Sequence, residues 1–281
     1  MASLPAPDQP LSSKSGRVKA ARRLARRASR AEHRLFLAEG SKALTEALHL
    51  PGCVVEVFAT EEAGMTFAAL RHAVSDAGIA WFTVTDDALA ALAGSVTPQG
   101  VVAVCRFVDV GMDALLEATA LDGAPAPVVV CADVRDPGNA GTIIRTADAV
   151  AAAGVVLAGN SVDPYNDKTV RATVGSLFHL PLVLEPDPAA AVRQLHEAGR
   201  TVLAADGAGE LDLFDAARRG TLSGPVAWLF GNEAWGLPEE LAELADHRVA
   251  IPIRGRAESL NLSTAAAVCL YATQQATDGR S

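Results

Sequence analysis

Three polar segments of the sequence, each directly after an apolar run, carry the side chains best suited to chemistry. They are residues 133–146, 229–237 and 251–265. In the first, Pro137 and Gly138 predict a tight turn and Asn139 is well suited to cap the following helix, so a routine strand-to-helix turn explains these three. It does not explain Arg145, which lies beside two isoleucines one to two turns into that helix. We expect its guanidinium to meet an anion.

The other two segments combine similar groups. Glu233 follows an apolar strand in a glycine-flanked turn, where backbone amides are expected to be exposed. Ser259 and Asn261 precede an alanine-rich helix, and capping of that helix is an alternative explanation for either residue taken singly. Arg254 and Arg256 in the same segment indicate a second anion contact.

Alternating strand-like and helix-like runs predict the elements that position these segments. In the second half, near-continuous Val, Ile and Leu runs predict a parallel sheet covered on both faces, whose ligand chemistry belongs in the loops after the strands. Six strands are expected there, at 127–132, 154–158, 180–184, 200–205, 226–230 and 248–253. We therefore expect an α/β protein with a flexible tail at 1–13, a first domain at 14–108, a linker at 109–126 and a second domain at 127–281.

Several other kinds of site lack their usual residues. The sequence has no P-loop, HExxH or GxSxG motif, and no GxGxxG follows a strand, which argues against the common nucleotide cofactors and zinc hydrolysis. The four cysteines show no CxxC spacing and the histidines are isolated, so we expect reduced core thiols and no metal. The reduced thiols indicate a cytoplasmic protein. No run of about 18 apolar residues is present, so we expect no membrane span.

The charge of the chain is unevenly distributed. With 24 Lys and Arg against 33 Asp and Glu, the net charge of −9 taken alone argues against a polyanion partner. Residues 14–34, however, hold nine basic residues and one acid, so this segment carries +8 and the remainder −17. We predict a helix over about 18–35 whose basic face contacts phosphate; a merely solvated face is the alternative. Its cations are Lys19, Arg22, Arg23, Arg26, Arg27, Arg30 and Arg34.

The three polar segments, in order, resemble a known set of motifs. DPGNAGTIIRTADA, LFGNEAWGLP and IPIRGRAESLNLSTAAAV look like the three motifs of the SpoU (TrmH-type) RNA 2′-O-ribose methyltransferases of the SPOUT superfamily. Residues 161–180, SVDPYNDKTVRATVGSLFHL, also resemble the family between its first and second motifs. The N-terminal part resembles, more loosely, the L30e-like α/β substrate-binding domain of the ribosomal-RNA members.

This resemblance implies a fold, a cofactor and an assembly. It implies an L30e-like RNA substrate-binding domain at 14–108, and a methyltransferase domain at 127–281 whose parallel sheet ends in a trefoil knot. It further implies S-adenosylmethionine bound bent in that knot, and a homodimer whose active site borrows from both subunits. The implied substrate is RNA, and ribosomal RNA is favoured by the likeness of the first domain.

The resemblance also implies roles for residues of this sequence. The implied catalytic set is Asn139, Arg145, Glu233, Ser259 and Asn261. The implied cofactor-binding set is Phe230, Gly231, Asn232, Ile251, Ser259 and Leu260. We expect RNA contacts from Arg22, Arg23, Arg26, Arg27, Arg30, Lys168, Arg171, Arg254 and Arg256. In one departure from the family, Ala257 and Glu258 stand where an apolar residue is often found, which puts the RNA contact there in doubt.

Alternatives remain open on the sequence alone. A transfer RNA could be the substrate, the chain could be a non-catalytic RNA-binding or ribosome-assembly protein, or it could be a nucleotide-binding enzyme such as a dehydrogenase. In the favoured reaction we expect Arg145 to hold the ribose or its phosphate, because an arginine is almost always protonated and is a poor base. Whether it acts as base or as electrostatic clamp is not decided by the sequence.

Overall fold

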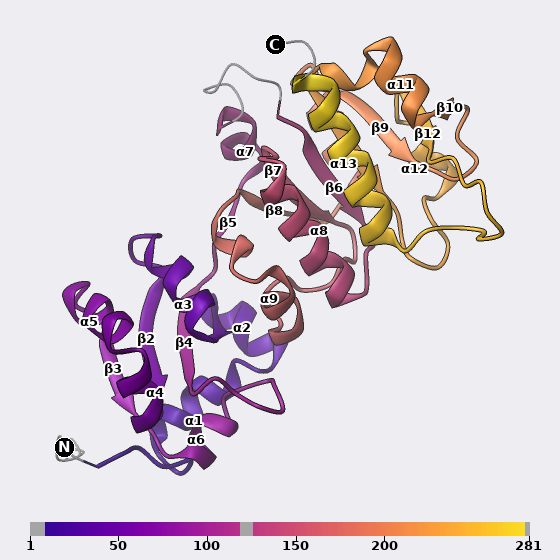
Figure 1. Ribbon diagram of the computed structural model, residues 1–281. Coiled ribbons are helices and arrows are strands. Elements are labelled where there is room, and N and C mark those ends of the chain that lie inside the picture. Colours follow the sequence, from indigo (N-terminus) through magenta and orange to yellow (C-terminus); the bar gives the residue numbers. More distant parts are fainter. Residues whose placement is uncertain (1–8, 119–125, 279–281) are drawn as a thin grey trace. The chain divides into compact units, whose positions relative to one another are not determined.

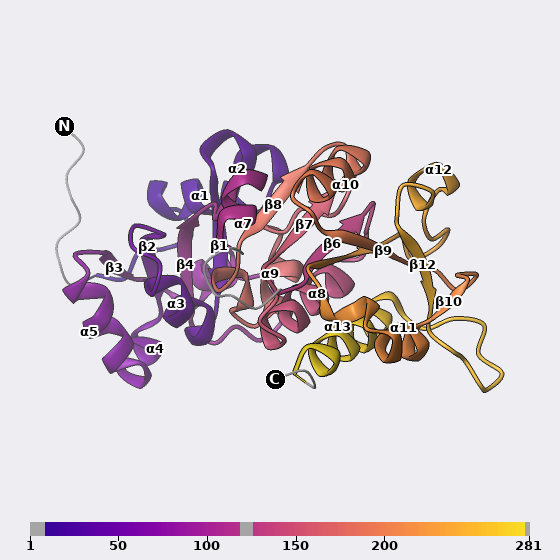
Figure 2. The same cartoon turned by 90° about the horizontal axis from the view of Figure 1, so that it is seen from above.

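The computed structural model describes residues 9–118 and 126–278. Within them the chain forms two compact units, the first from residues 1–108 with 163–178 and the second from 109–162 with 179–281. Figures 1 and 2 show both units as ribbons, coloured from indigo to yellow along the sequence.

The first unit is a four-stranded mixed sheet covered by helices. Its strand order is β1-β4-β2-β3; β4 is antiparallel to both of its neighbours, whereas β2 and β3 are parallel. Helices α1 and α6 share an apolar cluster with one face of the sheet. Figure 2 shows α3 and α5 on the side of the sheet opposite to α1. The strands are Leu35–Glu39, Val54–Ala59, Ala80–Thr83 and Val101–Arg106 for β1 to β4. The helices are α1 Gly16–Arg23, α2 Arg27–His33, α3 Ser41–Leu48, α4 Glu61–Thr66, α5 Ala68–Asp76, α6 Asp86–Ala90, α9 Asp167–Thr173 and the 3-10 turn η1 Ser176–Phe178.

The expected helix over 18–35 is wrong, because the segment folds as two helices, α1 and α2. Arg26 between them is extended, and the buried Arg30 donates from Nη1 to the carbonyl oxygens of Leu24 and Ala25 at 2.9 Å each. These carbonyls lie where α1 has ended, so the guanidinium satisfies acceptors that a continuous helix would have used. Arg34, with φ of 53°, then turns the chain into β1.

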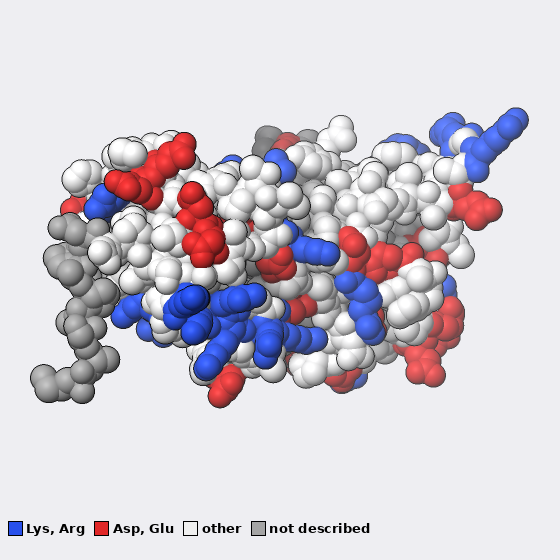
Figure 3. Space-filling model, turned by 90° about the horizontal axis from the view of Figure 1, so that it is seen from below, with Lys and Arg blue, Asp and Glu red and all other residues white. Residues whose placement is uncertain are grey.

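The burial of Arg30 also corrects its expected role in RNA binding. Its Nη2 pairs with Asp163 at 2.6 Å, and its side chain is only 6% exposed. Arg17 of α1 is exposed but pairs with Glu56. Five further exposed cations lie in α1, in the break after it and at the start of α2, and we call them the basic cluster: Lys19, Arg22, Arg23, Arg26 and Arg27. Figure 3 shows Lys and Arg concentrated on one face of the first unit.

Residues 163–178, which the sequence places in the second domain, pack into the first unit. Tyr165 is 1% exposed and stacks on Phe107 with ring centroids 3.8 Å apart, while Phe36 lies 4.9 Å away. The backbone N–H of Val108 donates to the Tyr165 hydroxyl at 2.9 Å. The aromatic contacts and the Arg30–Asp163 pair therefore make this later segment part of the core of the first unit.

The expected tail and linker also differ from the structure where their residues are described. The backbone N–H of Leu11 donates to Thr83 at 2.8 Å, so the sheet edge already holds the chain there. Strand β5 (Asp109–Val110) pairs with β8, and Leu115 of helix α7 (Met112–Ala118) is fully buried. The remaining parts of these two expectations, residues 1–8 and 119–125, lie outside the described residues.

The second unit is an eight-stranded parallel sheet, which confirms the expected α/β class and its parallel sheet. The strand order is β10-β12-β9-β11-β6-β7-β8-β5, and all strand pairs are parallel. The three central strands β11, β6 and β7 are buried along their whole length, as their apolar runs predict. Besides β5 the strands are β6 Val128–Ala132, β7 Gly154–Ala158, β8 Leu182–Glu185, β9 Thr201–Ala205, β10 Leu211–Asp212, β11 Val226–Phe230 and β12 His247–Ala250.

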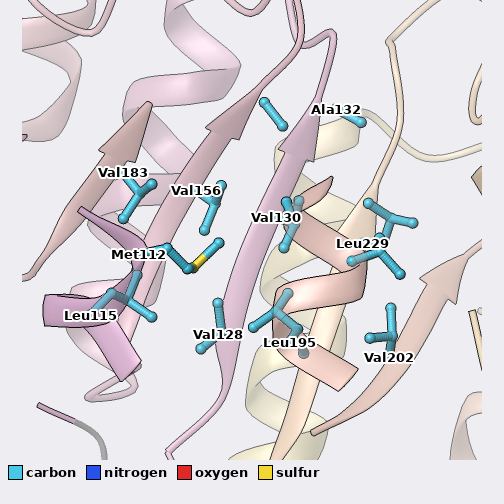
Figure 4. Close-up of a cluster of buried hydrophobic side chains, with 14 of the residues drawn as sticks. Met112, Leu115, Val128, Val130, Ala132, Val156, Val183, Leu195, Val202 and Leu229 are labelled. Atoms are coloured by element: carbon cyan, nitrogen blue, oxygen red, sulfur yellow. The ribbon is translucent and has the colours of Figure 1, made fainter. Parts of the chain in front are cut away.

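Side chains alternate between the two covered faces of this sheet. Figure 4 shows one face, where Val128 and Val130 of β6 join Leu195 of helix α10 (Pro188–Glu197) and residues of α7. The opposite face carries α8 (Pro137–Ala149), α11 (Leu213–Arg219) and α13 (Leu262–Asp278) (Figure 2). There the buried Trp228 donates from its indole N–H to Thr273 at 2.9 Å. The short helices η2 (Thr221–Ser223) and α12 (Glu239–Ala242) complete the unit.

We expect substitution Arg30→Ala to destabilise the first unit by about 3–5 kcal/mol, because it leaves the Asp163 carboxylate partly buried without its partner. Native-state hydrogen exchange of the β1 and β4 amides measures this change. The control Arg27→Ala removes an exposed cation and should stay within about 0.5 kcal/mol. Equal effects of the two substitutions would show that the Arg30–Asp163 pair does not stabilise the first unit.

Candidate active site

The three polar loops meet at one edge of the second sheet. They follow β6, β11 and β12, and β6 and β11 are direct neighbours in the strand order. Because the strands are parallel, their carboxyl ends lie at the same edge of the sheet. After β6 the chain continues into β7, which is the neighbour of β6 on one side, whereas β11 is its neighbour on the other side. This is the switch-point position at which open α/β sheets bind ligands.

Asn139 connects the three loops through its side chain. Its Nδ2 donates to Glu233 Oε1 at 3.2 Å, and its Oδ1 accepts from Asn261 Nδ2 at 3.0 Å. The expected capping role belongs instead to Asp136, whose Oδ1 accepts from the backbone N–H of Asn139 at 2.8 Å. Since Asp136 caps α8, the Asn139 amide is free to join the other loops.

Glu233 accepts hydrogen bonds from the first loop and does not pair with Arg145. The backbone N–H groups of Arg135 and Asp136 donate to its two oxygens at 3.1 and 2.9 Å. Partial burial works to raise the pKa of Glu233, but these backbone donors and the Asn139 amide outweigh it, so its pKa lies below the ordinary value. The side chain is therefore a carboxylate that fixes the first loop against the second.

The loop after β11 is a tight hairpin that requires glycine. The backbone groups of Asn232 and Gly236 bond to each other in both directions at 2.9 Å, and Asn232 Nδ2 donates to the Asp133 carbonyl at 2.7 Å. A Cβ on Gly231 would lie 2.3 Å from backbone atoms of Gly236. Such a distance is too short for any side chain, so only glycine fits at this position. The glycine thus permits the close return of the chain beside the site.

A pocket of about 300 Å³ opens at this edge, and it brings together all six expected cofactor-binding residues. Those six are Phe230, Gly231, Asn232, Ile251, Ser259 and Leu260, and Glu233 lines the pocket beside them. Asp206 and Gly207, which were not expected from the sequence, follow β9 and form another part of the wall. The signal available for them was the acid and glycine directly after a predicted strand.

Asp206 is held rigidly by its neighbours. Arg248 donates to its Oδ2 from Nε and Nη2 at 3.0 and 2.6 Å, and the backbone N–H of Ala208 donates to its Oδ1 at 2.9 Å. Burial alone would raise the pKa of Asp206, yet these donors leave it below the ordinary value. This part of the pocket wall is therefore fixed by charge-assisted hydrogen bonds.

Of the three remaining residues that were expected to be catalytic, Ser259 and Asn261 lie at the site and Arg145 does not line the pocket. Arg145 lies on the exposed side of α8, does not line the pocket, and has no ion pair or hydrogen bond with the described residues. The described residues of its own chain therefore do not supply the anion that its guanidinium was expected to meet. Asn261 caps α13, with its Oδ1 accepting from the backbone N–H of Ser263 at 3.0 Å, so capping and contact with Asn139 coexist in one side chain. Ser259 is exposed at the pocket.

The expected RNA-contacting residues fall into two groups. Arg22, Arg23, Arg26, Arg27, Lys168, Arg254 and Arg256 are exposed. Arg171 is partly buried and pairs with Asp167 at 3.1 Å and Glu39 at 3.4 Å, so much of its charge is neutralised within the first unit.

Two further expectations concern metals and membranes. Across the described residues, 9–118 and 126–278, no group of three or more His, Cys, Asp and Glu side chains is arranged to hold a metal ion. In the same ranges no helix has the length and apolar character needed to cross a membrane.

Comparison with known proteins gives consistent matches over most of the chain. Residues 126–271 match the model of the SpoU rRNA Methylase family, and residues 16–103 match an MRM3-like substrate binding domain. The chain is 32% identical over 263 residues to the 23S rRNA (guanosine(2553)-2′-O)-methyltransferase RlmP of Bacillus subtilis. The aligned region covers 92% of this chain and 96% of that protein.

Solved structures agree with these matches. An AdoMet-bound rRNA methyltransferase from Sinorhizobium meliloti superposes with a TM-score of 0.81 at 33% identity, covering 95% of this chain and 97% of that one. The SpoU methyltransferase AviRb from Streptomyces viridochromogenes, in complex with AdoMet, gives 0.80 at 28% identity and covers 93% and 98%. Since the family model spans more than half of the sequence and includes all three polar loops, the chain belongs to the SpoU rRNA Methylase family.

Proposed function

We propose that this protein uses S-adenosylmethionine to methylate a ribose 2′-hydroxyl of ribosomal RNA. The observation that carries the proposal is the hydrogen-bonded set of Asn139, Glu233 and Asn261, which joins the three loops beside one pocket. The relative from B. subtilis is named for 2′-O-methylation of a 23S rRNA guanosine, and it matches over nearly the full length of both chains. A protein that only binds RNA has no need for all three loops.

The pocket fits S-adenosylmethionine in size and in the character of its wall. Its volume of about 300 Å³ is at the lower end for a small-molecule site, and Val249, Ile251 and Leu260 supply apolar surface for an adenosine group. Gly207 and Gly231 lack side chains, so backbone amides and carbonyls remain accessible. When bound, the cofactor supplies an electrophilic methyl group on a cationic sulfur.

In this proposal, the residues around the pocket hold the ribose hydroxyl and the methyl donor in line with each other. Asn139 and Glu233 keep the first two loops fixed, and Ser259 offers a hydroxyl at the pocket for the ribose. Holding the hydroxyl oxygen, the methyl carbon and the sulfur in line is worth about 7–11 kcal/mol in favourable cases. Positioning is therefore the main contribution that we assign to this site.

Arg145 acts in this proposal on the pocket of a second subunit. Its side chain is exposed and does not line the pocket of its own chain, yet it belongs to the first of the three motifs. In a homodimer whose partner covers the exposed side of α8, the guanidinium would hold a ribose or phosphate oxygen and stabilise the negative charge that develops on the hydroxyl oxygen. The dimer thus belongs to the proposed mechanism itself.

We assign the RNA contacts to the basic cluster of the first unit and to the loop that holds Arg254 and Arg256. These side chains are exposed and can reach phosphate, whereas Arg30 cannot. The match of residues 16–103 to a substrate-binding domain supports the first of these assignments. We place the protein in the cytoplasm, where its four buried cysteines would stay reduced.

The proposed function predicts ribose methylation of 23S rRNA by the purified protein. Transcribed 23S rRNA, 16S rRNA and total transfer RNA, each incubated with methyl-labelled S-adenosylmethionine, should give one major ribose-methylated nucleotide in the 23S sample, located by mass mapping. Label confined to transfer RNA would overturn the rRNA assignment. Absence of transfer to any of the RNAs, despite cofactor binding, would favour a non-catalytic RNA-binding protein.

Substitution Arg145→Ala should lower kcat about 10²- to 10³-fold while cofactor affinity stays nearly unchanged, because the side chain lies outside the pocket of its own chain. Co-expression with Gly231→Val, whose side chain would collide with Gly236, tests whether Arg145 acts on the partner. Mixed dimers should regain activity, since one subunit keeps an intact pocket and the other an intact Arg145. Mixed dimers that stay inactive would assign Arg145 to its own subunit.

Replacement of Arg22, Arg23, Arg26 and Arg27 by Gln should make RNA binding less salt-dependent. Because the variant can no longer neutralise four phosphates, the slope of log K against log salt concentration should become shallower by about 3. The control, Arg193→Gln with Arg219→Gln, removes two exposed cations from the second unit and should leave the slope nearly unchanged. An unchanged slope in the fourfold variant would mean that the basic cluster is only solvated.

A further inference from the structure

The charged residues that line the candidate cofactor pocket are all acidic. Asp206, Glu233 and Glu258 line it, and among its described lining residues there is no Lys, Arg or His. A pocket lined in this way carries a negative potential, which stabilises a cationic ligand relative to a neutral one of the same shape.

Two of these three carboxylates are already occupied by donors. Asp206 is bound by Arg248 and the backbone of Ala208, and Glu233 is bound by the first loop. Their orientation is fixed and their charge is shared with these donors. They therefore form the wall of the pocket and contribute only part of its negative electrostatic potential.

Glu258 differs from the other two acids. It is exposed, and within the described residues it has no ion pair or hydrogen bond. Arg254 and Arg256 belong to the same loop, but neither of them lines the pocket.

The proposed reaction changes the charge of the molecule in this pocket by one unit. As the methyl carbon bonds to the ribose oxygen, its bond to sulfur breaks, the sulfur keeps the electron pair and becomes a neutral thioether, and the hydroxyl proton passes to solvent. The donor thus carries a sulfonium charge that the product, S-adenosylhomocysteine, lacks. A carboxylate near the sulfur attracts the donor more strongly than the product.

We propose that Glu258 is a specificity-determining residue that makes this pocket favour the cationic methyl donor over its neutral thioether product. This inference rests on the proposed function, because it requires the cofactor to bind in this pocket. Its consequence is that the product leaves more readily and competes less with fresh donor. The acidic lining therefore acts on turnover as well as on binding.

The test is a set of binding measurements by calorimetry on the full chain, with Glu258→Gln compared with the unaltered protein. Three ligands are used: S-adenosylmethionine, S-adenosylhomocysteine, and the analogue in which a protonated amine replaces the methylsulfonium. Glu258→Gln should weaken binding of both cationic ligands about 3- to 10-fold and change that of the thioether less than about 2-fold, because only the cations gain from the carboxylate. High salt should reduce the difference, since Glu258 is exposed.

A matched control removes the same charge at the other edge of the sheet. Glu197 is exposed at the end of α10, just before the start of β9, whereas the pocket lies where β9 ends. Glu197→Gln should leave the ratio of donor to product affinity unchanged. Equal weakening of all three ligands by Glu258→Gln, or no change in the ratio, would overturn the inference while leaving the proposed function intact. Failure of the unaltered protein to bind the donor at all would instead overturn the proposed function.

Discussion

The two hydrogen bonds of the Asn139 side chain are the constraint on which the candidate site depends. They join Asn139 to Glu233 and Asn261, which lie 94 and 122 positions further along the chain, across three loops that no strand pairing connects directly. Each of these bonds exists only because other groups satisfy the local backbone, since Asp136 caps α8 in place of Asn139 and backbone amides hold Glu233. Removal of a single polar group would therefore release a loop, and with it part of the pocket wall.

The parallel sheet explains how such distant residues meet. Strands β6 and β11 are neighbours, so the loops that follow them leave the same edge, and β9 and β12 add the loops with Asp206 and Ile251. The apolar character of β6, β7 and β11 made this arrangement predictable, because strands buried on both faces read as continuous apolar runs. Six of the pocket residues were expected from the resemblance of the three loops to the family motifs, whereas Asp206 and Gly207 were not expected at all. The hydrogen bonds among the site residues could not be predicted, because they depend on side-chain directions that spacing does not determine.

The boundary between the units shows where sequence patterns are insufficient. Residues 163–178 read as one more helical segment of the second domain, yet Tyr165 stacks on Phe107 and Asp163 pairs with Arg30. Nothing in the local pattern distinguishes an aromatic residue that packs on its own domain from one that packs on another. The same is true of Arg30, which has the helical spacing of the exposed arginines before it. Its burial follows from the break after α1, where free carbonyl groups need a donor.

The exposure of Arg145 has a physical consequence for the reaction. A guanidinium in bulk water interacts with an oxyanion only weakly, because the high dielectric constant and dissolved ions screen it. The same group becomes strong when a second surface excludes water from around it. The proposed role of Arg145 therefore requires that another surface closes over α8, since this side chain is exposed and does not line the pocket of its own chain.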